Sequence, residues 1–162
     1  MYNFELTDYQ KEIRQRAETF AQEELLPGVI ERDKTETYDM SILKKLGEAG
    51  LIGLQFDPKY GGHGNDYLAF LLVVEELCKV DSAFGISYAI SSTFTTGIDS
   101  FGSEDQKMHC MPRLFAGDAI GCFALTEPDA GSDAGSAKTQ AIRDGDTFIL
   151  NGKKHYITNS AV

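Results

Sequence analysis

The first two thirds of the chain alternate between stretches with apolar residues at helical spacing and short clusters of polar, glycine and proline residues. From Ile13 to Ala21, apolar residues recur every three or four positions with charged residues between them, which predicts an amphipathic helix. Thr7 is followed three residues later by Gln10, the pattern of a capping box at a helix N-terminus. Pro27 and Gly28 then predict the end of this helix.

Two further helices are predicted before residue 81. One begins after Asp39 and ends at Gly50, with its apolar residues on one face. The other spans Tyr67 to Val80 and is apolar on almost every side, apart from two glutamates and one lysine. Because a helix without a polar face needs cover all round, we expect this one in the middle of a helix bundle.

A fourth helix is expected directly after the third. Asp81 and Ser82 cap its start, it reaches about Ser100, and Gly102 closes it. The stretch from Gly85 to Phe94 within it carries no charge and is rich in small residues. By pattern alone, this stretch is interpreted as a core helix with small packing residues.

A fifth helix begins with a second capping box, formed by Ser103 and Gln106. Pro112 has no backbone N–H and its ring clashes with the preceding turn. We therefore expect this helix to be kinked or divided near Cys110 and Met111.

Beyond residue 117 the chain changes to short strand-like runs separated by turn signals. The apolar run from Ala119 to Leu125 predicts a strand. Asp144-Gly145 predicts a hairpin turn ahead of a strand from Thr147 to Leu150, and another turn signal precedes His155 to Thr158. Helices first and strands afterwards is an α+β order.

We therefore expect an all-α helical domain over residues 1–117 and the first strands of a β-domain over residues 118–162. A few strands without further partners form a poorly stabilised sheet. The β-domain is accordingly expected to be incomplete within these residues, with its remainder in further sequence or in a partner chain.

Charge and composition narrow the class of protein. The formal charge is −10, from 25 acidic and 15 basic residues, and such a surface repels nucleic-acid backbones. The three cysteines form no CxxC pair, which fits a reducing compartment without a disulfide framework. No secretory signal is recognised at the N-terminus, and the longest apolar run, Tyr67 to Val74, is too short for a membrane span. We expect a cytoplasmic protein that binds neither nucleic acid nor membrane.

The segment from Phe123 to Asp133 is the clearest candidate for chemistry. An apolar strand delivers Thr126, and a loop of small, proline and hydroxyl residues follows, whose free amides and hydroxyls suit an anionic ligand. A polar turn without a ligand explains the same residues, and the pattern alone leaves both open. His63 and His109 lack the spacing and the partners of a metal site, so no metal is expected.

Five segments, in order, resemble the acyl-CoA dehydrogenase family over essentially the whole chain. The loop just described looks like the family's flavin-binding signature, Leu-Thr-Glu-Pro-x-Ala-Gly-Ser-Asp, and the segment Asn151–Asn159 looks like its second flavin segment. The other three segments are Tyr60–Gly64, Glu75–Leu77 and Phe101–Lys107. The resemblance implies that the β-domain is the beginning of a β-barrel and that the cofactor is FAD.

The resemblance also implies roles for single residues. Phe123, Ala124, Leu125 and Thr126 would lie along the flavin ring, with the Thr126 hydroxyl on its pyrimidine side. Gly131 and Ser132 would meet the FAD pyrophosphate, and Ser132 would also lie close to the coenzyme A part of the substrate. Tyr156 would pack on one ring face, Ile157 beside it, and Thr158 would donate its hydroxyl toward the ring nitrogen N5. The stretch 85–94 would line one wall of the acyl pocket.

Two positions depart from the family's pattern. Asp129 stands where the family commonly has Gly, which places an additional carboxylate near the pyrophosphate; Tyr156 stands where Trp is frequent, and both supply an aromatic face. The family's catalytic base is a carboxylate of a C-terminal helical domain, so we expect none within residues 1–162. Glu75, Glu76 and Glu127 are interpreted as solvated or capping carboxylates.

Two functions of different classes are consistent with these residues. In the first, the chain is part of a flavin-dependent acyl-CoA dehydrogenase of fatty acid metabolism. That enzyme would desaturate acyl-CoA thioesters at the α and β carbons, pass electrons to an electron-transfer flavoprotein and assemble as a homo-oligomer; the related acyl-CoA oxidases differ in the electron acceptor. In the second, the chain is a helical binding or scaffold module without turnover. Because the base is expected elsewhere, residues 1–162 alone are expected to be inactive.

Overall fold

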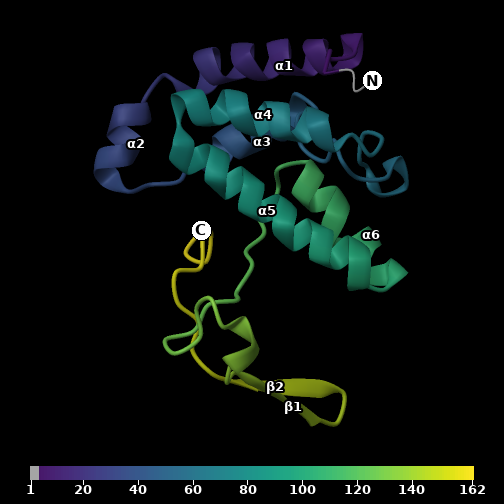
Figure 1. The fold of residues 1–162 in the computed structure, drawn as a ribbon, viewed down its shortest axis with the longest axis vertical. Helices are drawn as coiled ribbons and strands as arrows, with labels where there is room; N and C mark the ends of the chain where they lie inside the picture. The colour runs from purple at the N-terminus through teal and green to yellow at the C-terminus, as the bar shows by residue number, and fades with distance from the viewer. Residues whose placement is uncertain (1–3) are drawn as a thin grey trace.

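The computed structural model describes residues 4–162, so the first three residues of the predicted helical domain lie outside it. The chain runs through a group of helices and ends in a small lobe with one hairpin (Figure 1). The helices are α1 (Asp8–Phe20), which continues into a π-helical turn (Ala21–Leu25), α2 (Val29–Thr35), α3 (Met40–Glu48), α4 (Tyr67–Val80), α5 (Ser82–Phe101) and α6 (Glu104–Phe115); 3₁₀ turns occupy Pro58–Tyr60 and Ala134–Ser136, and the strands are β1 (Gln140–Asp144) and β2 (Thr147–Asn151).

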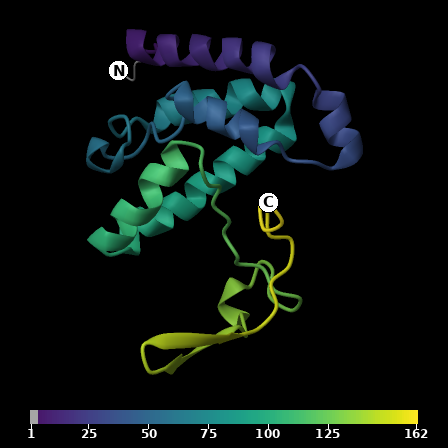
Figure 2. The same ribbon diagram turned by 180° about the vertical axis from the view of Figure 1, so that it is seen from behind.

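The helices pack around α4. Helix α1 lies against α4, α5 crosses beneath it, and α6 packs on the C-terminal half of α5 (Figures 1 and 2). Each of these helices places its apolar stripe inward, and removing these side chains from water is the main favourable contribution to folding. The central core is formed by α1, α3, α4 and the first part of α5, with Ile13, Leu46, Val73 and Leu77 almost fully buried. A second cluster joins α6 to the 3₁₀ turn at Pro58–Tyr60.

The predicted helix starts are confirmed by their hydrogen bonds. The Thr7 hydroxyl accepts from the Gln10 N–H at 3.2 Å, and the Ser103 hydroxyl accepts from the Gln106 N–H at 3.2 Å. In both boxes the glutamine side chain accepts from the N-cap N–H in return. Each bond satisfies a donor that an α-helix leaves unpaired.

One expectation about the helices is wrong in part. Helix α6 is not divided at Pro112, which lies in its final turns and is followed by the buried Leu114 and Phe115. One missing backbone bond near the end of a helix costs less than the packing of these side chains contributes. Helix α4 lies in the middle of the helices, as expected, although Tyr67 and Leu71 are each 55% exposed.

Helix α2 was not anticipated from the sequence. It has no buried residue, and its two flanking positions, Gly28 (φ 79°) and Glu36 (φ 52°), both have left-handed backbone conformations. Without an apolar stripe, the periodicity that reveals a core helix is missing. Its position is fixed by Arg32, which pairs with Asp81 at the junction of α4 and α5 at 3.0 Å.

The lobe after residue 118 contains less sheet than expected. The hairpin is confirmed: β1 and β2 are antiparallel, Asp144 pairs with Thr147, and Gly145 (φ 59°) begins the two-residue turn. The strand predicted over Ala119 to Leu125 is extended but has no ladder partner, and His155 to Thr158 forms no strand but leads into a turn. All ten hairpin residues are exposed. The α+β order is therefore confirmed, with only the beginning of a sheet present. Within residues 4–162, no helix is long and apolar enough to cross a membrane.

Candidate functional site

Glu127 organises the loop that carries the strongest motif. Its side chain is only 6% exposed and accepts hydrogen bonds from the Lys138 N–H at 2.6 Å, the Thr139 N–H at 2.9 Å and the Lys154 Nζ at 2.8 Å. Backbone bonds from Glu127 to Ala130 and back close a tight turn beside it, at 3.0 and 3.2 Å. The bond from Lys154, followed by those from Thr139 and Lys138, holds the pKa of Glu127 far below its ordinary value. Glu127 is thus an ionised cross-link between three segments at neutral pH rather than a solvated carboxylate.

The two motif segments lie next to each other. The His155 N–H donates to the Thr126 carbonyl at 2.9 Å, and the Lys154 ammonium donates to the Leu125 carbonyl at 2.9 Å. These contacts bring together residues about 30 positions apart, and Figure 1 shows the two segments running side by side below α5. The predicted residues 123–126 and 156–158 therefore belong to one surface.

The predicted site residues differ in their exposure. Phe123, Leu125 and Tyr156 are 46%, 45% and 91% exposed although they are large and apolar. Thr126, Ile157 and Thr158 are half-buried, whereas Ala124, Gly131 and Ser132 are exposed. Within the described chain, the hydroxyls of Thr126, Ser132 and Thr158 have no hydrogen-bond partner, so they are available to a ligand.

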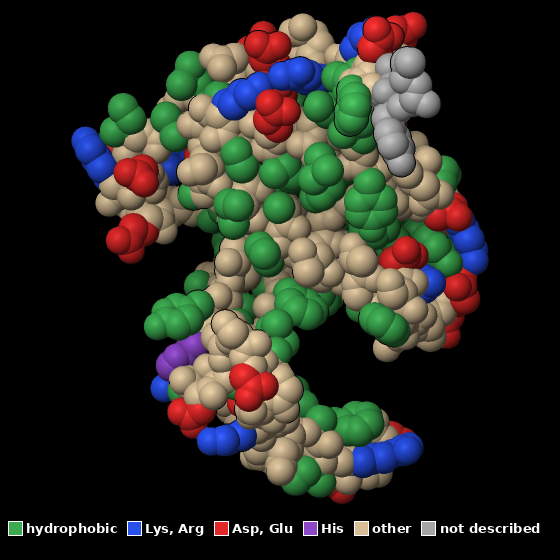
Figure 3. Space-filling model, in the orientation of Figure 1, with side chains coloured by type: hydrophobic (Ala, Val, Ile, Leu, Met, Phe, Trp, Pro, Cys, Tyr) green, Lys and Arg blue, Asp and Glu red, His purple; other side chains and the backbone are tan. Residues whose placement is uncertain are grey.

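Two hydrogen bonds attach this lobe to helix α5, and a third joins two segments of the lobe beside them. The Asn159 Nδ2 group donates to the carbonyls of Ser87 and Gly121 at 3.0 and 2.9 Å. The Gly121 N–H donates to the Ser91 hydroxyl at 2.9 Å. Figure 3 shows that the lobe and the helices meet through a narrow connection, so these bonds carry much of the attachment. They were not foreseen, because they join residues 30 to 72 positions apart and periodicity reports only neighbours along the chain.

The carboxylates near the helices are engaged by cations. Glu76 is buried and accepts from Arg14 at 2.7 Å and from Lys79 at 2.8 Å. Burial alone would raise the pKa of Glu76, but the bonds from Lys79 and Arg14 outweigh it and lower the pKa. Glu75 pairs with Lys79 at 3.4 Å. Glu76 is therefore a buried ion-pair partner, whereas Glu75 is a half-exposed one.

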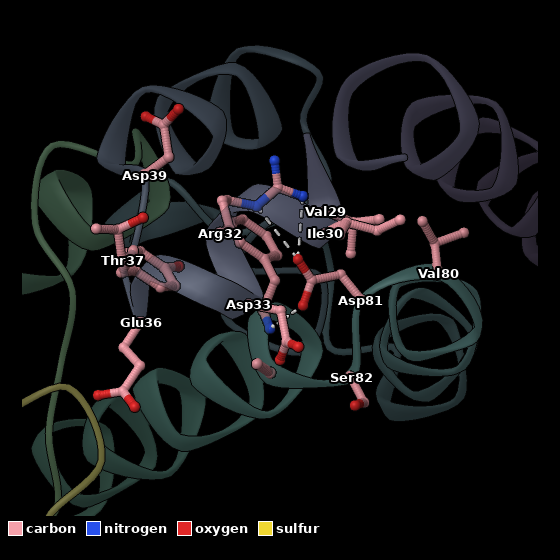
Figure 4. A pocket seen from close by; sticks show the side chains of 13 residues that line it. Val29, Ile30, Arg32, Asp33, Glu36, Thr37, Asp39, Val80, Asp81 and Ser82 are labelled. Carbon is pink, nitrogen blue, oxygen red and sulfur yellow. Dashed lines mark hydrogen bonds and ion pairs between the residues drawn. The ribbon is translucent and has the colours of Figure 1, made fainter. Parts of the chain in front are cut away.

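A cavity of about 540 Å³ lies elsewhere, between α2 and the junction of α4 and α5 (Figure 4). Arg32 and Asp81 point toward each other across it, and the buried Tyr38 hydroxyl beside it has no hydrogen-bond partner in the described chain. None of the predicted site residues lines this cavity. No cluster of three or more His, Cys, Asp or Glu side chains suited to a metal ion occurs within residues 4–162.

Comparison with known proteins identifies the family of this chain. The family model "Acyl-CoA dehydrogenase, N-terminal domain" matches residues 7–118, and "Acyl-CoA dehydrogenase, middle domain" matches residues 122–162. The chain belongs to the acyl-CoA dehydrogenase family. The probable acyl-CoA dehydrogenase YngJ of Bacillus subtilis is 42% identical over 160 residues, which are 98% of this chain and 42% of YngJ.

Solved structures of the family have the same fold. A chain from a study of the electron transferring flavoprotein of Acidaminococcus fermentans superimposes with a TM-score of 0.93 at 43% identity, over 98% of this chain and 42% of that chain. The acyl-CoA dehydrogenase of Bacillus anthracis complexed with FAD gives a TM-score of 0.91 at 34% identity, over 99% of this chain and 28% of that chain. The chain thus spans less than half the length of the relatives it matches.

Proposed function

We propose that residues 1–162 form the part of a flavin-dependent acyl-CoA dehydrogenase that holds the reactive ring of FAD and one wall of the acyl-CoA site. The observation that carries this proposal is the contact between Thr126 and His155, which places the two motif segments on one surface. The FAD bound by the Bacillus anthracis relative supports the choice of cofactor. We further propose that the helical domain ends near residue 117, where the β-domain begins.

The residues present fit a flavin. Phe123, Leu125 and Tyr156 expose apolar surface that a planar ring system would cover. The backbone N–H groups of residues 123–126 make no hydrogen bond within the described chain, and three hydroxyls nearby are likewise unpaired. Apolar surface combined with unpaired donors is the surface that a heteroaromatic ring with polar edges requires.

Each residue has a distinct task in this proposal. Phe123 to Thr126 would lie along the ring, with the Thr126 hydroxyl bound to its pyrimidine side, and Tyr156 would pack on a ring face beside Ile157. Thr158 would donate a hydrogen bond to the ring nitrogen N5. Gly131 and Ser132 would bind the pyrophosphate, with Ser132 also near coenzyme A. The exposed Asp129 is paired with Lys138 at 2.9 Å, which offsets its negative charge beside this anion.

FAD, when bound, accepts the hydride that leaves the β carbon of the thioester. The chain's own residues orient the ring and form one wall of the site with helix α5. A base must also remove the α-proton, and neither Glu76 nor Glu127 suits this task, because their cationic partners lower the pKa of both carboxyls. We propose that this base lies outside residues 1–162. We also propose an electron-transfer flavoprotein as electron acceptor, a cytoplasmic location, a role in fatty acid metabolism and a homo-oligomeric state.

The test is to purify the gene product that contains these residues and to record its visible absorption spectrum before and after anaerobic addition of butyryl-CoA and octanoyl-CoA. We expect a bound flavin spectrum that is bleached by at least one thioester. A folded protein that stays colourless when FAD is supplied would instead support the scaffold function.

A further inference from the structure

We propose that Asn159 is a positioning residue, which sets the distance between the flavin-binding segments and the acyl-pocket wall formed by helix α5. Its single side-chain amide donates both of its hydrogens, one to Ser87 of α5 and one to Gly121 ahead of the flavin loop. Asn159 directly follows Thr158, the residue assigned to the ring nitrogen. This inference rests on the proposed function.

The backbone at Asn159 is adapted to this task. Its φ of 68° lies in the left-handed region, which asparagine tolerates better than most other residues. The turn over residues 158–161 brings the amide back toward α5. The position therefore needs both a left-handed backbone and two donors on a short side chain, and asparagine supplies both.

Gly121 and Ser91 complete a closed connection. The Ser91 hydroxyl accepts from the Gly121 N–H at 2.9 Å, while the Gly121 carbonyl accepts from Asn159 at 2.9 Å. Gly121 is buried, and a Cβ atom there would lie 2.6 Å from the Phe94 ring of α5, so the Gly121 backbone lies against this ring too closely for any side chain at position 121. Two segments of the lobe are thereby held to adjacent turns of one helix, Asn159 at Ser87 and Gly121 at Ser91, and the Asn159–Gly121 bond joins the two segments.

This connection determines where the Thr158 hydroxyl sits relative to the wall that the thioester would contact. Without the two Asn159 bonds, the flavin segments would keep their own contacts through Glu127 and Lys154, which do not involve Asn159. FAD should then still bind, but the flavin ring and the thioester would no longer be held at a fixed distance and orientation. Small misplacements of reacting groups reduce rates strongly while leaving binding almost unchanged.

The test uses Asn159→Gly and Asn159→Asp in the gene product that contains these residues. Glycine keeps the left-handed backbone and removes both donors; aspartate keeps the shape and replaces the donors with oxygens that the carbonyls repel. Asn65→Gly is the matched control, because Asn65 also has a left-handed backbone (φ 67°) but is exposed in a loop and makes no hydrogen bond to α5 within residues 4–162. Rapid-mixing measurement of flavin reduction by butyryl-CoA is set beside a thioester titration and the flavin absorption spectrum.

For both Asn159 variants we expect reduction at least about tenfold slower than in the wild type, as expected for the loss of two hydrogen bonds that orient reacting groups. FAD content should be unchanged and thioester affinity should change by less than about threefold, whereas Asn65→Gly should behave as the wild type. Wild-type rates in flavin-replete Asn159→Gly would overturn this inference alone. A wild-type protein that binds no flavin would overturn the proposed function, and this inference with it.

Discussion

Replacing Gly121 with alanine should separate the lobe from helix α5. The added Cβ would lie 2.6, 2.8 and 2.9 Å from three atoms of Phe94, whereas carbon atoms in ordinary contact are about 3.5–4.0 Å apart. Relieving these contacts requires a shift of about 1 Å. A shift of this size would stretch the 2.9 Å bond from Gly121 to Ser91 beyond hydrogen-bonding distance.

The cost combines two effects. Overpacking of this kind costs about 1–3 kcal/mol, and one lost hydrogen bond adds about 1 kcal/mol. We therefore expect the lobe to open more easily by about 2–4 kcal/mol, at the low end if the half-buried Phe94 ring turns aside. Gly97→Ala on the same helix is the control: a Cβ there meets no atom within 4 Å, and alanine should stabilise the helix by about 0.5–1 kcal/mol.

Amide hydrogen exchange at the Gly121 N–H, which donates to the Ser91 hydroxyl, gives the free energy of opening of the lobe from α5. Urea unfolding followed by circular dichroism gives the free energy of unfolding of the helices. The two substitutions should change stability in opposite directions. If Gly121→Ala leaves the exchange at position 121 within about 0.5 kcal/mol of the wild type, Gly121 does not lie as close to α5 as the structure shows.

Two further substitutions test the site. Glu127→Gln should remove a pH dependence of lobe stability. Because the pKa of Glu127 is lowered in the folded state, the ionised carboxylate stabilises the lobe above the ordinary carboxyl pKa near 4.5, and this stabilisation is lost as the pH falls below it. The variant should therefore be less stable than the wild type at pH 7 and equally stable in acid, as measured by amide exchange at Thr139. Equal stability of the two proteins at pH 7 would contradict the cross-link. Thr158→Ala should slow flavin reduction by the equivalent of about 1–3 kcal/mol of activation free energy while thioester binding is kept, which rapid mixing beside a titration can measure; an unchanged rate with FAD fully bound would refute the assigned role.

Local signals accounted for every α-helix except α2 and for the hairpin, but not for the rest of the lobe. Caps at Thr7, Asp81 and Ser103 depend on neighbours within three residues, so the sequence alone was enough to predict them. The extended run from Ala119 to Leu125 looked like a strand because apolar alternation cannot show whether a ladder partner exists. Helix α2 escaped prediction for the opposite reason, since it has no apolar stripe to reveal it.

The candidate site was predicted through family resemblance rather than through physical pattern. The motif around Thr126 can also be interpreted as a polar turn without a ligand. Only the order of the five family-like segments along the chain pointed to a flavin. The residues that build the surface were missed as a group, because Glu127, Lys154 and Asn159 act through contacts with distant segments of the chain. Glu127 was interpreted from the sequence as a solvated or capping carboxylate, whereas the structure shows it buried and paired with Lys154.

The central claim is that residues 123–126 and 156–158 form one flavin-binding surface. It can be tested most directly by titrating FAD into isotopically labelled protein and recording two-dimensional amide NMR spectra, to which a chain of 162 residues and 17.8 kDa is well suited. We predict shifts concentrated at Phe123–Thr126, Gly131–Ser132 and Tyr156–Asn159, with none among the residues that line the cavity beside Arg32 and Asp81. Shifts confined to that cavity, or none at saturating FAD, would contradict the account.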